Sequence, residues 1–294
     1  MNNEKKESNK PTKSVKQLEL ELSYLLWNHC VPYHPDTTMI PNMIKGIETD
    51  KQIGNYSLGE TIGYGSFAVV KYCTSITGEN RVIKLIDKSC VTSVGQAKRI
   101  STEIYALNVL QSEYITNLHD IIHSESYIAL VLDSGPPDLY NYIELNRDGI
   151  EESIVKKIVK NILIAIQFCH EKYIYHLDLK PENILLDVIK DYRIVLCDFG
   201  LCNFSRSDNM SITNGMVGSP GFFAPEMKIK NEYSVEKADV WSIGAITLEI
   251  MCGHELFFDV WLKRYYIMVD NKVFKKIYKR PSKTSYKTTH GRPN

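Results

Sequence analysis

The sequence predicts an α+β fold made of two lobes: a small antiparallel β lobe that carries one helix, and a larger, mainly helical lobe. Three observations lead to this prediction. Segments with strand-like alternation dominate the first part of the chain, and segments with helical spacing dominate the second. A run of turn residues, Asp133-Ser134-Gly135-Pro136-Pro137, separates the two parts and is a natural hinge. A chain of 294 residues, of which 44% are hydrophobic, can bury a core of this size.

The predicted β lobe rests on short alternating runs that end at turn signals such as Thr77-Gly78. A single helix interrupts these runs over residues 96–110, where Ile100, Ile104 and Leu107 recur at helical spacing. The strands that we expect cover residues 56–62, 68–74, 80–86, 118–122 and 126–132.

The predicted helical lobe rests on longer apolar stretches with helical spacing. Two of them, residues 162–169 and 243–252, are too short or too interrupted to cross a bilayer, so we interpret them as buried helices and expect no membrane span. The helices that we expect cover residues 138–145, 152–171, 238–252 and 261–277.

The chain divides into four predicted parts. Residues 1–50 form an N-terminal extension that is partly disordered, because it begins rich in Lys, Asn, Ser and Glu. Its segment 18–27 carries five leucines and is either a short amphipathic helix or an apolar stretch of a loop-rich extension. Residues 51–133 form the β lobe and 134–278 the helical lobe, whose completeness stays open. Residues 279–294 form a basic tail, interpreted as a solvated end.

Composition bounds the function. Thirty-five basic and thirty-five acidic residues cancel, so global charge indicates neither nucleic acid nor a membrane surface as a partner. The seven cysteines have no C-x-x-C spacing, which is typical of reduced thiols in the cytoplasm, with the nucleus as the alternative. The polar, lysine-rich N-terminus has no apolar stretch directly after its charges, so we do not interpret it as a signal peptide.

The strongest functional signal is the run His176-Leu177-Asp178-Leu179-Lys180-Pro181-Glu182-Asn183, followed fifteen residues after Asn183 by Asp198-Phe199-Gly200. In this order the chain supplies a candidate base in Asp178 and a point charge for phosphate in Lys180. It also supplies two oxygen ligands for magnesium, Asn183 and Asp198. Each residue alone is also typical of a turn, a surface or a cap. Together at this spacing they indicate phosphoryl transfer to a hydroxyl.

These motifs resemble those of the eukaryotic-type protein serine/threonine kinase family, over roughly residues 56–260. The wording of the motifs is most similar to the calcium/calmodulin-dependent kinase group or its neighbours, with a short C-terminal lobe. The resemblance implies a protein-kinase-like fold and ATP and Mg²⁺ as cofactors. It further implies Asp178 and Lys180 as catalytic residues, and Asn183 and Asp198 as the metal ligands.

The resemblance also implies a nucleotide site. Glycines in Gly63-Tyr64-Gly65-Ser66 would let the backbone approach phosphates. Lys84 would hold the α- and β-phosphates, and Glu103, nineteen residues further on, would orient Lys84. Asp138 would either contact the ribose or cap the helix that follows it. The predicted nucleotide-binding residues are Ile62, Gly63, Tyr64, Gly65, Ser66, Val70, Val82, Lys84, Glu103, Asp133, Gly135, Asp138 and Leu185.

Within this set, the resemblance gives several residues a place around the adenine ring. Val70 would cover the ring and Leu185 would form its floor. Backbone groups near Asp133 and Gly135 would meet the edge of the base. Leu132 stands at the position that the family calls the gatekeeper.

Two positions depart from the family pattern. Ala68 replaces the third glycine of the phosphate loop, and we expect a slightly poorer approach to phosphate, not a loss of binding. Leu177 replaces an arginine that in many members receives an activation-loop phosphate. We therefore predict that activity does not require phosphate on Ser211 or Thr213.

The C-terminal part shows no convincing late arginine that would pair with Glu226, and a buried unpaired carboxylate is costly. Three explanations stay open: the lobe is compact, a partner completes it, or the chain is truncated and marginal. Ser219 stands in place of a threonine whose hydroxyl usually links Asp178 and Lys180, and serine keeps that hydroxyl. Asp239 would anchor the backbone of the catalytic loop.

The expected substrate is a protein, with basic residues upstream of the phosphorylated Ser or Thr. Glu182 and Glu249 stand where basic-directed kinases place carboxylates, although both also fit ordinary structural positions. Met216 and Phe223 would line a pocket for the residue after the phosphoacceptor. The alternative function is a pseudokinase or scaffold that binds ATP or partners without efficient turnover.

Overall fold

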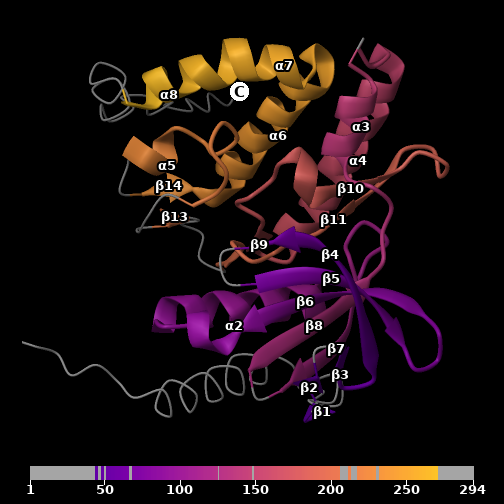
Figure 1. The fold of residues 1–294 in the computed structure, drawn as a ribbon. Coiled ribbons are helices and arrows are strands. Elements are labelled where there is room, and N and C mark those ends of the chain that lie inside the picture. Colours follow the sequence, from indigo (N-terminus) through magenta and orange to yellow (C-terminus); the bar gives the residue numbers. More distant parts are fainter. Residues whose placement is uncertain are drawn as a thin grey trace, which may run out of the picture.

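The computed structural model describes nine stretches of the chain: residues 44–45, 48–49, 51–65, 68–124, 126–147, 149–205, 211–212, 217–229 and 232–270. The predicted helix over 18–27, the residues Ser66, Thr213 and Met216, and the basic tail lie outside the described residues. Within the described residues, the fold is the predicted α+β arrangement of a small sheet-based lobe and a larger helical lobe (Figure 1).

The small lobe is built on one curled, eight-stranded sheet with strand order β1-β7-β8-β6-β5-β4-β3-β2. All neighbouring pairs are antiparallel except β1 with β7. The five longer strands lie where the sequence predicts strands; β1 and β2 come from the predicted N-terminal extension. The strands are β1 Ile44–Lys45, β2 Glu48–Thr49, β3 Gln52–Ile53, β4 Tyr56–Tyr64, β5 Ala68–Ser75, β6 Asn80–Asp87, β7 Leu118–His123 and β8 Tyr127–Asp133.

Among the described residues, helix α2, Val94–Val109, is the one α-helix of this lobe, and it follows the short 3₁₀ turn η2, Lys88–Cys90. It begins with a capping box, in which the Ser93 hydroxyl accepts from the Gln96 backbone N–H and the Gln96 side-chain oxygen accepts from the Ser93 backbone N–H. Ala97, Ile100 and Ile104 recur at helical spacing and are buried in one cluster with residues of β6, β7 and β8. This packing fixes α2 against the sheet, as Figure 1 shows.

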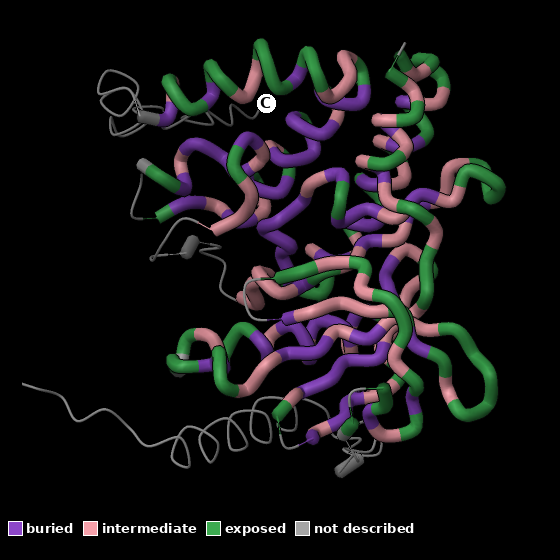
Figure 2. The backbone as a smooth tube through the Cα atoms, in the orientation of Figure 1, coloured by how far each residue is buried: buried purple, intermediate pink, exposed green. Residues whose placement is uncertain are grey.

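The large lobe is organised around two long helices, α4 (Glu152–Glu171) and α6 (Val235–Cys252), which pack against each other. Figure 2 shows that α6 is buried along much of its length. The other elements of this lobe are short. They are α3 Leu139–Leu145, β9 Ile174–Tyr175, η3 Pro181–Asn183, β10 Ile184–Asp187, β11 Arg193–Leu196, β12 Asn203–Phe204, β13 Ser211–Ile212, α5 Glu226–Ile229 and β14 Tyr233–Ser234.

The last helical segment differs from the prediction over residues 261–277. It begins at His254, directly after Gly253, and runs through α7 (His254–Leu256), the π-helical turn η4 (Phe257–Leu262) and α8 (Lys263–Asp270). The start was wrong because Phe257 is already a buried position, at helical spacing from buried Tyr265 and Val269. Residues of the predicted helix beyond Asp270 lie outside the described part.

One hydrophobic cluster spans both lobes. It joins the end of α2, at Leu107 and Leu110, to α4, to the β10–β11 hairpin, to α6 and to Phe199. The two lobes therefore share core packing behind the region where the predicted site residues lie. None of the described helices is both long and apolar enough to cross a membrane.

Candidate active site

Lys84 stands at the centre of the sheet and joins both lobes. It lies on β6, opposite Val70 of β5 and Leu130 of β8. Its Nζ is 2.6 Å from Glu103 Oε1 on α2 and 2.8 Å from Asp198 Oδ1, which follows β11. Three predicted residues that are far apart in the sequence are thus in direct contact.

The charges of these three groups depend on one another. Burial alone would lower the pKa of Lys84, but the charges of Glu103 and Asp198 outweigh it and raise that pKa, so Lys84 stays protonated. Burial raises the pKa of Glu103, and Lys84 opposes this effect. Burial would also raise the pKa of Asp198, but Lys84 overcomes it and the pKa is lowered. The site is thus arranged to hold one fixed cation between two carboxylates.

Asp178 is buried, with 8% of its surface exposed, and its carboxylate is held from two sides. Ser219 Oγ donates to Asp178 Oδ1 at 2.7 Å. Asn183 Nδ2 donates to the Asp178 carbonyl oxygen at 2.7 Å and to Oδ2 at 3.3 Å. The serine hydroxyl at position 219 therefore reaches Asp178, as predicted.

Asp239 on α6 holds the loop that carries Asp178 through hydrogen bonds to the loop backbone. Asp239 is fully buried, and its two oxygens accept from the backbone N–H groups of His176 (2.9 Å) and Leu177 (2.8 Å). The prediction that Asp239 anchors this loop is confirmed. The anchor also accounts for the left-handed backbone of Leu177, whose φ is 61°, because strain of this kind persists only where surrounding contacts hold it.

Asn183 and Asp198 lie at the same end of the β10–β11 hairpin, where the Cys197 N–H donates to the Asn183 carbonyl oxygen at 3.0 Å. The amide nitrogen of Asn183 is occupied by Asp178. Within the described residues, no donor meets Asn183 Oδ1 or Asp198 Oδ2. Two oxygens that can accept a cation are thus available, and oxygen is the ligand type that Mg²⁺ prefers. These residues fit the predicted metal.

The hinge between the lobes is braced by side chains that the sequence analysis did not identify. Asp133, the last residue of β8, accepts from Asn117 Nδ2 at 2.7 Å, and its Oδ1 lies 2.6 Å from His119 Nε2. Burial would raise the pKa of Asp133, but these contacts outweigh it and lower the pKa. The side chain of Asp133 is therefore occupied, and its backbone N–H also donates to the Asn117 carbonyl oxygen at 3.2 Å. Strand alternation gave no signal for this cross-strand contact.

The surroundings of the hinge are close-packed. A Cβ added at Gly135 would lie 2.3 Å from Leu185 Cδ1, so Leu185 packs directly against the hinge and would have to move its side chain for a larger residue. Asp138 is the N-cap of α3 and accepts from the Asn141 N–H at 2.8 Å. The capping interpretation of Asp138 is confirmed, and its ribose contact stays a prediction. Val82 pairs with Leu132 across β6 and β8.

The predicted phosphate loop connects β4 and β5. Gly63 pairs with Val70, and the Gly65 N–H closes the turn on the Ala68 carbonyl oxygen at 2.7 Å. Ile62 and Tyr64 are exposed on β4. Ala68 is buried among the apolar side chains that contact α2. The predicted effect of Ala68 on phosphate approach stays a prediction.

Lys180 is half-buried and directly precedes η3, two residues after Asp178. Glu182, on η3, is exposed. Glu249 differs: it is 1% exposed, and its Oε1 lies 2.8 Å from His254 Nδ1. Burial raises the pKa of Glu249, and His254 opposes this effect. Of the two carboxylates expected to face a basic substrate, only Glu182 is open to solvent.

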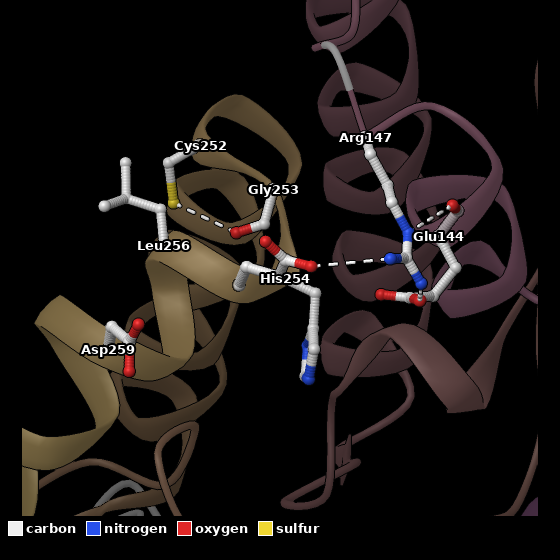
Figure 3. A pocket seen from close by; sticks show the side chains of 8 residues that line it. Glu144, Arg147, Cys252, Gly253, His254, Leu256 and Asp259 are labelled. Carbon is white, nitrogen blue, oxygen red and sulfur yellow. Dashed lines mark hydrogen bonds and ion pairs between the residues drawn. The ribbon is translucent and has the colours of Figure 1, made fainter.

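A pocket lined by His254 opens between the end of α3 and the start of α7 (Figure 3). Arg147, in the turn after α3, lies across it, with a Glu144 oxygen of α3 2.5 Å away and a Glu255 oxygen of α7 3.4 Å away. His254 also contacts Tyr140 of α3, edge to face, at 5.1 Å between ring centroids. The sequence analysis did not identify this cluster, because α3 and α7 are distant in the chain.

Glu226 is only half-buried, which corrects the expectation of a buried unpaired carboxylate. Among the described residues we find no ion pair of Glu226 with a basic side chain. Its partial exposure reduces the desolvation cost that the sequence analysis anticipated.

Comparison of the chain with known proteins identifies a matching family and several similar proteins. The model of the protein kinase domain matches residues 56–291. The carbon catabolite-derepressing protein kinase of Saccharomyces cerevisiae is 34% identical over 224 residues, which are 76% of this chain and 34% of that protein.

Two further relatives are similar over comparable stretches. The CBL-interacting serine/threonine-protein kinase 21 of Arabidopsis thaliana is 34% identical over 73% of this chain and 50% of its own length. The SNF-related serine/threonine-protein kinase of Rattus norvegicus is 32% identical over 70% of this chain and 28% of its own length. The chain thus spans half or less of the length of these relatives.

Proposed function

The chain belongs to the protein kinase family, and on that basis we propose that it is an ATP- and Mg²⁺-dependent protein serine/threonine kinase. One observation carries the proposal: Lys84 contacts both Glu103 and Asp198, while Ser219 and Asn183 orient Asp178. These contacts support a site between the lobes whose charges suit phosphoryl transfer. The relatives described above, two of which are named serine/threonine-protein kinases, support the same conclusion.

Each residue has a role in the proposed reaction. Lys84, held by Glu103, binds the α- and β-phosphates of ATP. Asn183 and Asp198 hold Mg²⁺, which supplies charge neutralisation on the phosphates. Asp178 accepts the hydrogen bond of the substrate hydroxyl at its carboxylate and orients that oxygen in line with the γ-phosphate. Lys180 offsets charge on the group that is transferred.

The remaining predicted residues enclose the nucleotide in this proposal. The backbone of Gly63 and Gly65 approaches the phosphates, and Val70 and Leu185 enclose the base. The Asp133 carbonyl oxygen and the Gly135 N–H meet its edge. The close contact of Leu185 with Gly135 supports this arrangement.

Activity without activation-loop phosphate is part of the proposal. Leu177 is buried in an apolar cluster with Phe223, Ala224 and Tyr233. The segment between β11 and α6 also forms two short β-ladders, β12 with β9 and β13 with β14. Apolar packing and backbone pairing thus hold the segment where other members use an arginine and a phosphate.

We further propose a preference for basic residues upstream of the phosphoacceptor, through Glu182, with Glu249 behind it. The exposure of Glu182 and the negative charges of Glu144 and Glu249 near Tyr140 support this preference. A positional peptide library tests it. Enrichment of Arg or Lys upstream is expected, and a flat profile contradicts the preference.

A partner that completes the large lobe is proposed on the outer face of α6. Val240, Leu248 and Met251 of this helix are 55%, 39% and 62% exposed, which is unusual for apolar residues on a central helix. Their replacement by Ser is expected to weaken association in sedimentation experiments. The cell compartment proposed for this function is the cytoplasm, with the nucleus as the alternative.

ATP turnover on generic basic peptides tests the proposed function, with the wild type compared with Asp178→Asn. We expect turnover by the wild type and a loss of about 100-fold or more in the variant, because the base is removed while the fold remains. A wild type whose melting temperature rises with Mg²⁺ and ATP, but which transfers no phosphate, contradicts the proposal and supports a scaffold.

A further inference from the structure

Three consecutive backbone carbonyls in the segment before α5 each accept a hydrogen bond from a side chain of the last helices. Trp261 Nε1 donates to the Gly221 carbonyl oxygen at 3.0 Å. Ser242 Oγ donates to the Phe222 carbonyl oxygen at 2.9 Å, and Tyr265 Oη donates to that of Phe223. The carbonyl groups of this segment are thus satisfied by side chains and not by a ladder or helix.

These carbonyls belong to the turn that carries Ser219. The N–H groups of Phe222 and Phe223 both donate to the Ser219 carbonyl oxygen at 3.1 Å, which closes the turn. At its start Gly218 has φ 99°, and a Cβ there would lie 2.6 Å from the Leu177 carbonyl oxygen. The turn therefore sits directly against the catalytic loop, and its position sets the reach of Ser219 Oγ to Asp178.

The two donors on the last helix are themselves held rigidly. Tyr265 is 1% exposed and packs edge to face against the Phe223 ring at 5.4 Å. Burial raises the pKa of its hydroxyl, so Tyr265 remains a donor. Trp261 contacts the Trp241 ring of α6 at 6.2 Å and the Tyr265 ring at 5.7 Å. Both donors are therefore fixed in orientation before any substrate binds.

The spacing of Trp261 and Tyr265 along the helix matches the spacing of the two carbonyl groups that they contact. Trp261 and Tyr265 are one helical turn apart, on the face of η4 and α8 that meets the segment, and they contact carbonyls two residues apart. Apolar contacts alone could pack this helix against the segment without the hydrogen bonds from Trp261 and Tyr265. The same helix also approaches Gly221, where an added Cβ would lie 2.5 Å from Leu262 Cδ1.

We propose that Trp261 and Tyr265 are positioning residues, which hold the Gly218–Phe223 turn so that Ser219 keeps Asp178 in its reactive orientation. This inference rests on the proposed kinase function. It also gives this segment a means of support that needs no charged pair: neutral hydrogen bonds from side chains to its backbone.

The test compares Tyr265→Phe, which removes only the hydroxyl, with the control Tyr266→Phe, whose ring is 46% exposed. We expect Tyr265→Phe to lower kcat about three- to tenfold while the KM for ATP changes less than about twofold. We also expect faster hydrogen exchange at the Phe222 and Phe223 amides. The control is expected to change neither. Trp261→Phe serves as the second variant if Tyr265→Phe does not fold.

The Ser219→Ala background separates positioning from general stability. There the effect of Tyr265→Phe on kcat is expected to disappear, because both changes act through the same contact. Equal loss of kcat in both backgrounds overturns the inference, as does unchanged amide exchange. A wild type without phosphoryl transfer would overturn the proposed function instead, and amide exchange alone would then decide the inference.

Discussion

At the scale of single residues, the orientation of Asp178 depends on groups from two distant parts of the chain. Asn183 is five residues away and holds one carboxylate oxygen, while Ser219 is forty-one residues away and holds the other. A carboxylate fixed in this way loses little further freedom when a substrate hydroxyl binds. A hydroxyl at position 219 is therefore what orients Asp178, and either serine or threonine can supply it.

We predict that Ser219→Ala lowers kcat about tenfold or more, because a hydrogen bond to a charged group is removed. Ser219→Thr keeps the hydroxyl and is expected to stay within about threefold of the wild type. Steady-state kinetics with saturating ATP and peptide measure both variants. Equal activity of the alanine and threonine variants would show that this contact does not orient Asp178.

A second residue gives the structure a pH dependence. Burial, together with the nearby charge of Lys88, lowers the pKa of His123 from its ordinary value of 6.5 to about 4. In the unfolded chain this histidine takes up a proton near pH 6.5, while the folded chain does not. Stability is therefore full above pH 6.5 and is lost as the pH falls from 6.5 toward 4.

We predict a loss of about 2 kcal/mol in the free energy of unfolding from this group between pH 7.5 and pH 5. His123→Gln has no proton to gain, so the difference in unfolding free energy between the two pH values is expected to shrink by that amount. Urea unfolding of both proteins at the two pH values gives the result. Identical pH dependence would mean that His123 already titrates normally in the fold.

At the scale of elements, the segment between β11 and α6 is held by several independent means. The ladders β12–β9 and β13–β14 join it to the large lobe, and Leu177 packs with Phe223 and Tyr233. None of these contacts involves a phosphate. The described residues of this segment therefore have a position that apolar contacts and backbone pairing maintain.

We predict that the double variant Ser211→Ala, Thr213→Ala keeps kcat within about threefold of the wild type, because position 177 holds a buried leucine, which cannot bind a phosphate. Protein produced in bacteria and confirmed as unphosphorylated by mass spectrometry is the suitable material. A complete loss of turnover in this variant would sink the prediction.

The elements also show what a sequence can and cannot predict. Helix α4 was predicted with its observed bounds because its apolar positions repeat over twenty residues. The start of the last helix was missed although buried Phe257 stands at helical spacing from Tyr265 and Val269, so a signal was present there. The contacts of Asn117 and His119 with Asp133, and of Trp261 and Tyr265 with backbone carbonyls, carry no local signal, since their partners are set by tertiary packing.

The motifs themselves were more informative than the periodicity. Lys84, Glu103 and Asp198 were chosen from spacing and resemblance, and the structure brings them into contact. Glu249 shows the limit of that reasoning, because its position in the sequence did not reveal that it is buried against His254. Residue type and spacing thus predict which side chains have suitable charges better than they predict whether a given side chain is exposed to solvent.

At the scale of the whole molecule, the site is a contact between lobes. Lys84 comes from the sheet, Glu103 from α2 and Asp198 from the large lobe, while one hydrophobic cluster joins α2 to α4 and α6 behind them. The hinge is braced at Asp133 by β7. A movement of one lobe relative to the other would therefore break the contact between Lys84 and Asp198, unless Asp198 moved together with the small lobe.

Phosphate transfer from Mg²⁺ and ATP to a serine- and threonine-containing peptide, compared between the wild type and Asp198→Asn, tests the central claim most directly. The claim predicts transfer by the wild type and a rate at least about 100-fold lower in the variant, at similar melting temperatures. A wild type that binds Mg²⁺ and ATP without transferring phosphate, or a variant that transfers it at the same rate, would contradict the claim.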